Sequence, residues 1–396
     1  MGRPKRIFVN NLVYHITTKT VPETPGFYPK PHNLNPQLKN ALNANTKLAY
    51  ESSKQKKPLN QQQLMEITKQ YALKLNVNNC ANQKALNHPI STHLKKLKEQ
   101  RKKEKEKQKQ KASEFDEQLN ALSNEIQNSS LSKKKRKKLQ KQIKRLKELR
   151  KKHAKIPNPQ NTSQTYNDIK GMFQYIPRIL ILLVVAQALK KIMSMGFVLF
   201  HFVLMATHYH MLGMTTGKTK LDEIMRMFNW YIATEINKIL GRSGRFFHSR
   251  YKANILGNDE LGAIMLRYVY QNPKRTKLAI EPLDHDCTTF RVYLGKDEEF
   301  LVDISKECPI IKKLCKEGED KGEFLRNLVE QPLTDEVLNV VRFAIKRHQV
   351  WMTSETYESL SRRVKRKLKE AYEKLNESLQ KIDHFKPYFA PKSEAA

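Results

Sequence analysis

The chain has 396 residues, a length typical of two or three domains. Its 74 Lys and Arg outnumber 39 Asp and Glu, and the net charge of +35 predicts an anionic partner, with nucleic acid ahead of a membrane surface. The four cysteines form no CxxC pair, and residues 1–20 lack the apolar core of a secretory signal, so we expect a cytoplasmic protein with reduced thiols.

Residues 1–20 combine a basic start with a strand. At the two-residue period of a β-strand, one predicted face carries Val13, His15 and Thr17 and the other carries Tyr14, Ile16 and Thr18. The preceding segment contains Arg3, Lys5 and Arg6 as candidate DNA contacts. Two interpretations of this segment remain open, a basic arm that enters a nucleic-acid groove and a disordered start.

Residues 21–170 are predicted to form a basic insertion. Residues 21–92 are rich in Asn, Gln, Pro and Lys, which indicates a partly disordered connection with short helices at most. Residues 94–155 carry 24 Lys and Arg against 8 Asp and Glu, and two apolar stripes predict an antiparallel helical hairpin. The stripes are Phe115, Leu119, Leu122 and Ile126, and then Leu139, Ile143, Leu146 and Leu149. Solvated helices and helices lying on nucleic acid are compatible interpretations.

Residues 171–295 are less charged and are expected to form, with residues 1–20, a domain in which helices cover one sheet. The patterns predict helices at about 177–194, 221–240 and 259–272, the last closed by Pro273, and strands at about 197–214 and 245–256. Lys190 and Lys191 interrupt the apolar stretch 178–206 before it reaches the length of a membrane span, so no membrane partner is expected. Residues 296–396 are expected to be a charged helical extension.

The sequence HFVLMATHYHMLG carries two histidines one residue apart. On a strand, His208 and His210 share a face and Tyr209 points to the other. Two imidazoles can bind a divalent metal, but two ligands do not make a site. Polar residues at the end of a strand therefore remain the alternative unless a third ligand lies nearby.

The sequence LRYVYQNP offers a third ligand and a nucleophile. Tyr268 and Asn272 are four residues apart, so they lie on one face of the predicted helix. The amide oxygen of Asn272 can bind a hard metal ion, and the Tyr268 hydroxyl can act as a nucleophile once it loses its proton. Core packing of the tyrosine and a helix end at the asparagine are the alternatives.

These segments occur in an order that resembles a known family. YHITTKT, HFVLMATHYHMLG, FNWYIATEINKILGRSGRFFHSRYKANIL and LRYVYQNPKRTKLA together resemble the single-tyrosine transposases of the HUH (His, hydrophobic residue, His) superfamily. The likeness is greatest to the REP-associated tyrosine transposases of bacteria, in the insertion-sequence-200-like group. It covers roughly residues 3–20 and 175–295.

The resemblance implies a fold and a chemistry. The fold would be α+β, a ferredoxin-like HUH sandwich with an antiparallel sheet and helices packed on it. His208, His210 and Asn272 would bind Mg²⁺ or Mn²⁺, and Tyr268 would attack single-stranded or hairpin DNA, leaving a 5′-phosphotyrosine and a free 3′-hydroxyl. The family works as dimers, so a homodimer is expected, in the cytoplasm and with the nucleoid when bound to DNA.

The chain also departs from the family. Ala206 and Thr207 stand where the family usually has Pro-Asn, so the local approach to the metal is expected to differ. The insertion at 21–170 is unusually long, and it either adds DNA contacts or impairs activity.

Other residues near the motifs are weaker candidates. His248, Arg250 and Lys252 share a face of the predicted strand with Phe246, and this face is either solvated surface or a phosphate-binding surface. Tyr231 and Tyr270 are expected to pack in the core. The sequence DHDC at 284–287 fits no common metal-site spacing and is interpreted as a loop.

Two other classes of function remain open. One is a DNA-binding protein derived from a transposase that has no catalytic activity. The other is an RNA-binding protein, because long basic helices also suit structured RNA, although the sequence contains no RNA-recognition motif with aromatic strands.

Overall fold

The computed structural model describes residues 6–29, 33–34, 36, 39–40, 106, 110, 113–127, 133–153, 162–297, 300–347 and 349–389. They fall into two compact units, one with the described residues of 6–40 and 174–389 and one with those of 106–173. The first unit is α+β, which confirms the predicted class at that level. Arg3 and Lys5 lie outside the described residues.

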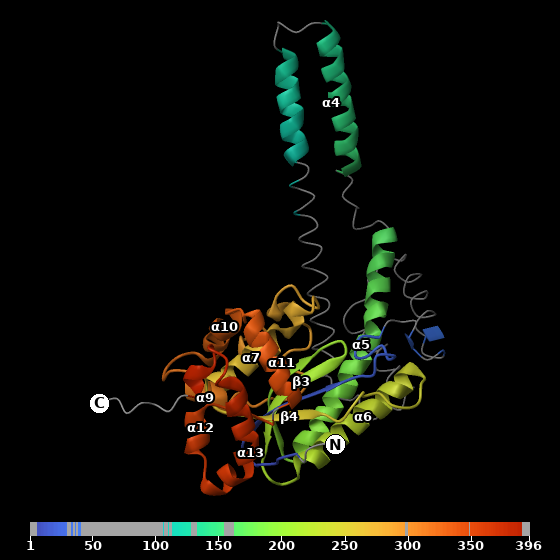
Figure 1. The fold of residues 1–396 in the computed structure, drawn as a ribbon. Helices are drawn as coiled ribbons and strands as arrows, with labels where there is room; N and C mark the ends of the chain where they lie inside the picture. The colour runs from blue at the N-terminus through green and yellow to red at the C-terminus, as the bar shows by residue number, and fades with distance from the viewer. Residues whose placement is uncertain are drawn as a thin grey trace, which may run out of the picture. The chain divides into compact units, whose positions relative to one another are not determined.

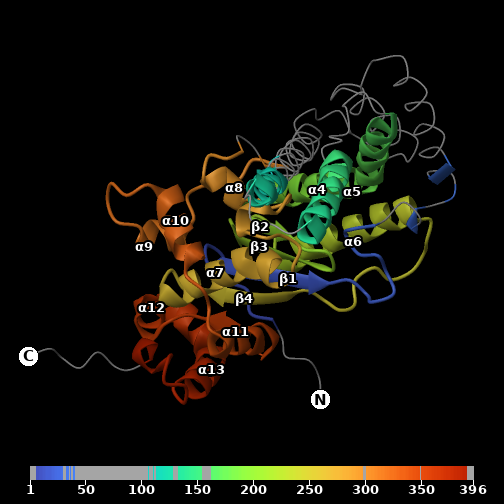
Figure 2. The ribbon, with the colours of Figure 1, turned by 90° about the horizontal axis from the view of Figure 1, so that it is seen from above.

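Five strands form one sheet in the order β2-β3-β1-β4-β5. Figure 1 shows β3 and β4 of this sheet, and Figure 2 shows β2, β3, β1 and β4 in that order. The strands are β1 (Val13–Lys19), β2 (Phe197–Leu204), β3 (His208–Thr215), β4 (Lys252–Leu256) and β5 (Val350–Trp351). The first four pair antiparallel, whereas β5 runs parallel to β4. The sheet is therefore mixed, and its fifth strand comes from the C-terminal region that was expected to be helical.

The predicted single strand at 197–214 is wrong, because the chain reverses within it. Met205 N donates to His208 O over 2.8 Å and closes a turn, so β2 and β3 form a hairpin. Phe27 N donates to Ala206 O over 2.7 Å and holds the turn from outside. The paired histidines consequently open the second strand of the hairpin rather than ending the first.

Three long helices pack around the sheet, α5 (Thr162–Ser194), α6 (Leu221–Leu240) and α7 (Glu260–Arg275). The predicted bounds of α6 are confirmed, and so is its apolar face, whose members Met225, Phe228, Ile232, Ile236 and Ile239 are all buried. The helix α5 begins well before the predicted 177 and continues through Pro177. No helix in the described part of the chain is long and apolar enough to cross a membrane.

The helices α6 and α7 cover opposite faces of the sheet. Tyr209 donates a 2.9 Å hydrogen bond to Asn229 of α6, whereas the neighbouring His210 contacts Asn272 of α7. Asp259 caps α7 by accepting from Gly262 N at 3.0 Å. The prediction that Pro273 ends this helix is wrong. The proline lies in the last turn, where the missing N–H costs one bond, and the helix runs on to Arg275.

The remaining secondary-structure elements described in this unit are helices, apart from β5. Its elements are η2 (Pro282–Asp284), α8 (Phe290–Tyr293), α9 (Pro309–Leu314), α10 (Lys321–Glu330), α11 (Asp335–Arg347), α12 (Ser354–Ser359), α13 (Arg362–Leu379) and η3 (Lys386–Tyr388). Trp351 of β5 is fully buried and donates its indole N–H to Leu261 O of α7. The C-terminal region is thus bound into the sheet and into α7.

The second unit contains a helix at 113–127 and α4 (Lys133–His153). Arg150 pairs with Asp116 at 2.8 Å, and Arg136 donates to Ile126 O at 3.3 Å. These interactions join the start of one helix to the end of the other, so the two helices run antiparallel. The predicted hairpin is therefore present over these residues, and of the remainder of 94–155 the structure describes only residues 106 and 110.

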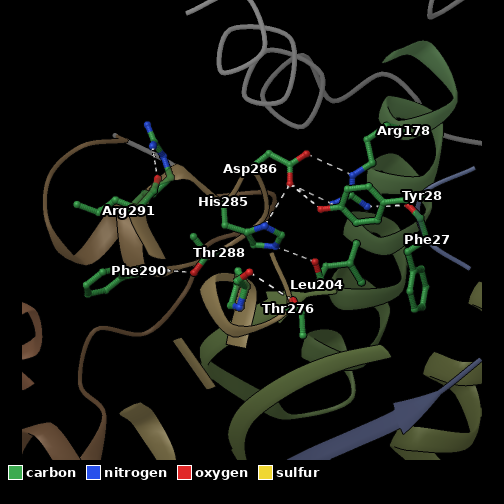
Figure 3. Close-up of polar contacts among 12 residues, drawn as sticks. Phe27, Tyr28, Arg178, Leu204, Thr276, His285, Asp286, Thr288, Phe290 and Arg291 are labelled. Atoms are coloured by element: carbon green, nitrogen blue, oxygen red, sulfur yellow. Dashed lines mark hydrogen bonds and ion pairs between the residues drawn. The ribbon is translucent and has the colours of Figure 1, made fainter. Parts of the chain in front are cut away.

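A buried ion pair joins three separate segments of the first unit (Figure 3). Arg178 of α5 contacts Asp286 at 3.2 and 3.3 Å, and both side chains are almost fully buried. The same guanidinium donates to Phe27 O and Tyr28 Oη, each at 2.8 Å, and stacks on the Tyr28 ring. The cluster fixes the segment after β1 and the segment after α7 to the start of the buried part of α5.

We expect Arg178→Ala to lower the free energy of unfolding by about 3–5 kcal/mol, because it leaves the Asp286 carboxylate buried without its partner. Urea unfolding followed by tryptophan fluorescence measures this, since both tryptophans, Trp230 and Trp351, lie in this unit. Lys374→Ala, which breaks an exposed pair, is the control and should leave the midpoint unchanged. Equal urea midpoints for the two variants would contradict the stabilising role assigned to the buried ion pair of Arg178 and Asp286.

Candidate functional site

Three of the predicted ligands converge on one point. His208 and His210 open β3, and their side chains face α7. The Asn272 side-chain nitrogen lies 3.2 Å from His208 Nε2 and 2.7 Å from His210 Nε2. The two-residue period of the strand and the four-residue period of the helix thus produce one cluster, as the sequence predicted for these three residues.

The other nitrogen of each imidazole is held by a polar neighbour. His210 Nδ1 lies 2.9 Å from His15 Nε2 on β1, and the two rings stack with centroids 5.1 Å apart. His208 Nδ1 lies 3.3 Å from Thr207 Oγ1, a residue at which the chain departs from the transposase pattern. Because Nδ1 is engaged in both rings, Nε2 is the nitrogen presented to the cluster in both.

Burial keeps these imidazoles neutral. Desolvation lowers the pKa of His208 to about 4, and the nearby Lys19 adds to the effect. The pKa of His210 falls well below its ordinary value through burial and then through repulsion from His208, His15 and Arg275. A neutral imidazole has a free lone pair, so both rings are in the form that binds a metal at neutral pH.

Tyr268 lies beside this cluster. Its ring meets that of His210 edge to face at a centroid distance of 5.7 Å. Arg275, one turn beyond Asn272 on α7, places its guanidinium 4.6 Å from the centroid of the Tyr268 ring and donates to Tyr268 O at 2.7 Å. Desolvation lowers the pKa of Arg275 to about 10, yet it stays charged at neutral pH.

The donor set fits a divalent cation. Two neutral imidazole nitrogens and one amide face the same point, and half a turn of the Asn272 amide replaces its nitrogen by its oxygen there. No group of three or more His, Cys, Asp or Glu that could hold a metal occurs among the residues described. A metal at this place would therefore need Asn272 as its third protein ligand, with its remaining positions open to the adjacent pocket.

That pocket has a volume of about 320 Å³ and contains His208, His210 and Tyr268 in its lining. His248, Arg250 and Lys252 line it as well, although the predicted strand at 245–256 is confirmed only in part. Only 252–256 are extended as β4, and Phe246 is buried instead of sharing their face. The three polar residues reach the pocket from an irregular segment and the first position of the strand.

The remaining candidates take structural positions. Arg6 stacks on the Tyr251 ring at 3.7 Å and donates to Tyr251 O, so it is attached to the fold beside Arg250. Tyr270 is buried as predicted, with its hydroxyl bonded to Thr289 and His201. In the DHDC segment, Asp286 pairs with Arg178, as described above.

Comparison of the chain with protein-family models, with curated proteins and with solved structures found no significant match. The likeness to the transposases therefore rests on the sequence motifs alone, and the geometry of the cluster is an independent observation beside it.

Several residues at the site were not singled out from the sequence. His15 was placed on the correct strand, but its pairing with His210 depends on a contact across 195 residues. Arg275 had a local signal, because it lies three residues after Asn272 on the same helix. Arg342 and Lys346, which also line the pocket, had none, because nothing in their helix points to this sheet.

We expect the metal-free protein to lose stability as the pH falls from about 6.5 toward 4. Burial lowers the pKa of His15 and His208 to about 4 and that of His201 to about 3, against 6.5 as the ordinary value. As the pH falls, the unfolded chain therefore binds protons at a higher pH than the folded chain does. Each such imidazole lowers the free energy of unfolding by about 1.4 kcal/mol per pH unit in this window. Urea midpoints measured between pH 7.5 and 4.5 test this, and His201→Gln should make the dependence shallower. Midpoints that do not change with pH would contradict it.

Proposed function

We propose that the protein is a single-tyrosine DNA nuclease and strand-transfer enzyme of the transposase type, acting on single-stranded or hairpin DNA with Mg²⁺ or Mn²⁺. The observation that carries the proposal is the convergence of His208, His210 and Asn272 beside Tyr268. The element order β1, α5, β2, β3, α6, β4, with the sheet order β2-β3-β1-β4, supports a ferredoxin-like HUH sandwich to which β5 is added.

A divalent cation at the cluster would polarise a phosphodiester oxygen and stabilise the charge that develops at phosphorus. His15 and Thr207 hold the imidazoles so that both Nε2 atoms stay directed at the cluster. Arg275 holds the Tyr268 ring in place by stacking on it and by donating to Tyr268 O. The Tyr268 hydroxyl gives up its proton and its oxygen forms a bond to phosphorus, while the bond from phosphorus to the 3′-oxygen breaks and that oxygen takes up a proton.

All four residues belong to one chain, so a single chain supplies the nucleophile and the ligand set together. The expected homodimer is therefore not required to complete the site. Its role, if it forms, would be to hold two DNA ends close to each other.

We expect Tyr268→Phe to abolish a covalent protein–DNA adduct while DNA binding is retained, because only the attacking hydroxyl is removed. A labelled single-stranded hairpin oligonucleotide is incubated with the protein and Mn²⁺ or Mg²⁺, and the adduct is detected by denaturing electrophoresis. Tyr231→Phe is the control, since its hydroxyl bonds to Gln187 of α5. An adduct that survives in Tyr268→Phe and disappears in another tyrosine variant would overturn the assignment.

The basic hairpin is the observation that favours a second candidate, a DNA-binding protein without catalysis. We expect deletion of residues 94–155 to make the dependence of log affinity on log salt shallower, by about 0.7 on single strands for each phosphate that the hairpin neutralises. Cleavage-site choice should not change, because the proposed catalytic residues lie outside this segment. An unchanged salt slope together with loss of a dimer in light scattering would instead assign the hairpin to assembly.

A further inference from the structure

Among the residues that the structure describes, the pocket next to the cluster is lined by cations and by no carboxylate. The five basic residues of this described lining are Lys19, Arg250, Lys252, Arg342 and Lys346. None of them belongs to an ion pair among the residues that the structure describes. Surface cations are usually interspersed with acidic groups, so an unneutralised set around a concave site indicates that an anion binds there.

Two of these cations come from α11, outside the part of the chain that resembles the transposases. Arg342 and Lys346 are one turn apart and both are exposed. The opposite side of α11 is packed into the unit through buried residues that include Val341 and Ala344. Asn254 of β4 donates to Ala344 O at 3.2 Å, and the helix leads directly into β5. The helix is therefore held in a fixed position at the wall of the pocket.

The cations lie close enough to affect one another. The pKa of Lys252 is lowered by desolvation and then by repulsion from Lys346. The pKa of Arg275, beside Tyr268, is lowered mainly by desolvation, with a contribution from Arg342. Such repulsion destabilises the free protein and is relieved when a polyanion binds between the charges.

The same helix exposes an aromatic ring. Phe343 is 49% exposed and lies beside Arg342 and three residues before Lys346. A phenyl ring exposed to this degree next to a row of cations is the combination that binds single-stranded nucleic acid, since bases stack on the ring while the cations follow the backbone. Duplex DNA, whose bases are already stacked, gains only from the cations.

We propose that α11 forms the wall of the site that binds the single strand, with Arg342 and Lys346 on phosphates next to the scissile one and Phe343 stacked on an unpaired base. This assignment deepens the proposed function and rests on it for the identity of the nucleic acid as DNA. The C-terminal region is accordingly a part of the substrate site and not an appendage to the catalytic domain.

The test measures binding in EDTA, so that it does not depend on cleavage. Fluorescence anisotropy follows a labelled single-stranded oligonucleotide, its duplex and its abasic form across a salt series. We expect the double variant Arg342→Gln, Lys346→Gln to lower the salt slope by about 1.4 on the single strand, because two phosphates are then no longer neutralised. The matched control is Arg363→Gln, Lys367→Gln, an exposed pair with the same spacing on α13, which should leave the slope unchanged.

Phe343→Ala should weaken binding of the normal single strand about fivefold or more and leave binding of the abasic strand and of the duplex unchanged. Trp230→Ala, which removes an exposed aromatic ring from α6 on the other face of the sheet, is its control. Fluorescence of Trp351 reports whether each variant of α11 is folded.

The outcomes separate this proposal from the proposed function. If the α11 variants bind DNA like the unmodified protein while the Tyr268 adduct forms, α11 does not form the wall of the single-strand site and the enzyme assignment stands. If no adduct forms and the α11 variants still weaken single-strand binding selectively, the role of α11 in binding the single strand is confirmed and the enzyme assignment is wrong. Equal losses in the α11 and α13 variants would overturn the proposal, and so would tighter, α11-dependent binding of RNA with the same sequence.

Discussion

The antiparallel pairing of β1 with β3 is the constraint on which the candidate site depends. Thr17 lies opposite His210 and Lys19 opposite His208, so both histidines share a face with His15. A slip of one residue would turn all these side chains toward α6. The burial of Tyr209 and Ile16 on the α6 face opposes that slip. Apolar packing on one side of the sheet thereby aligns the nitrogen donors on the other.

This pairing tolerates a separation of 150 residues between Tyr28 and Arg178 because the two ends of the intervening segment are fixed to each other. Arg178 donates to Phe27 O and Tyr28 Oη, and Phe27 N donates to Ala206 O beside the paired histidines. The two ends of this segment therefore lie at one place. The entropy of closing a loop rises only slowly with its length, so a long segment between two adjacent points costs the sheet little more than a short one.

The sequence predicted what depends on local periodicity. The face shared by His208 and His210, the face shared by Tyr268 and Asn272, and the buried side of α6 all follow from spacing within one element. The prediction from sequence failed where a contact between residues far apart in the chain determines the local structure. The turn at 205–207 lies in a continuous apolar run, and the bond from Phe27 that holds it comes from far away. The two-residue strand β5 is extended only because β4 offers its edge, and α11 reaches the pocket for the same reason.

Positive charge can act on a nucleic acid in two ways, which differ in the distance over which they work. Residues 94–155 carry a net charge of +16, and such charge attracts phosphates over about a Debye length without regard to sequence or geometry. That attraction cannot place one phosphodiester in line with a particular hydroxyl, because it has no preferred orientation. Positioning to the required fraction of an ångström needs short-range contacts from rigid elements. In this fold those contacts can come from β1, β4 and α11, which surround His210 and Tyr268 and are fixed to the same sheet.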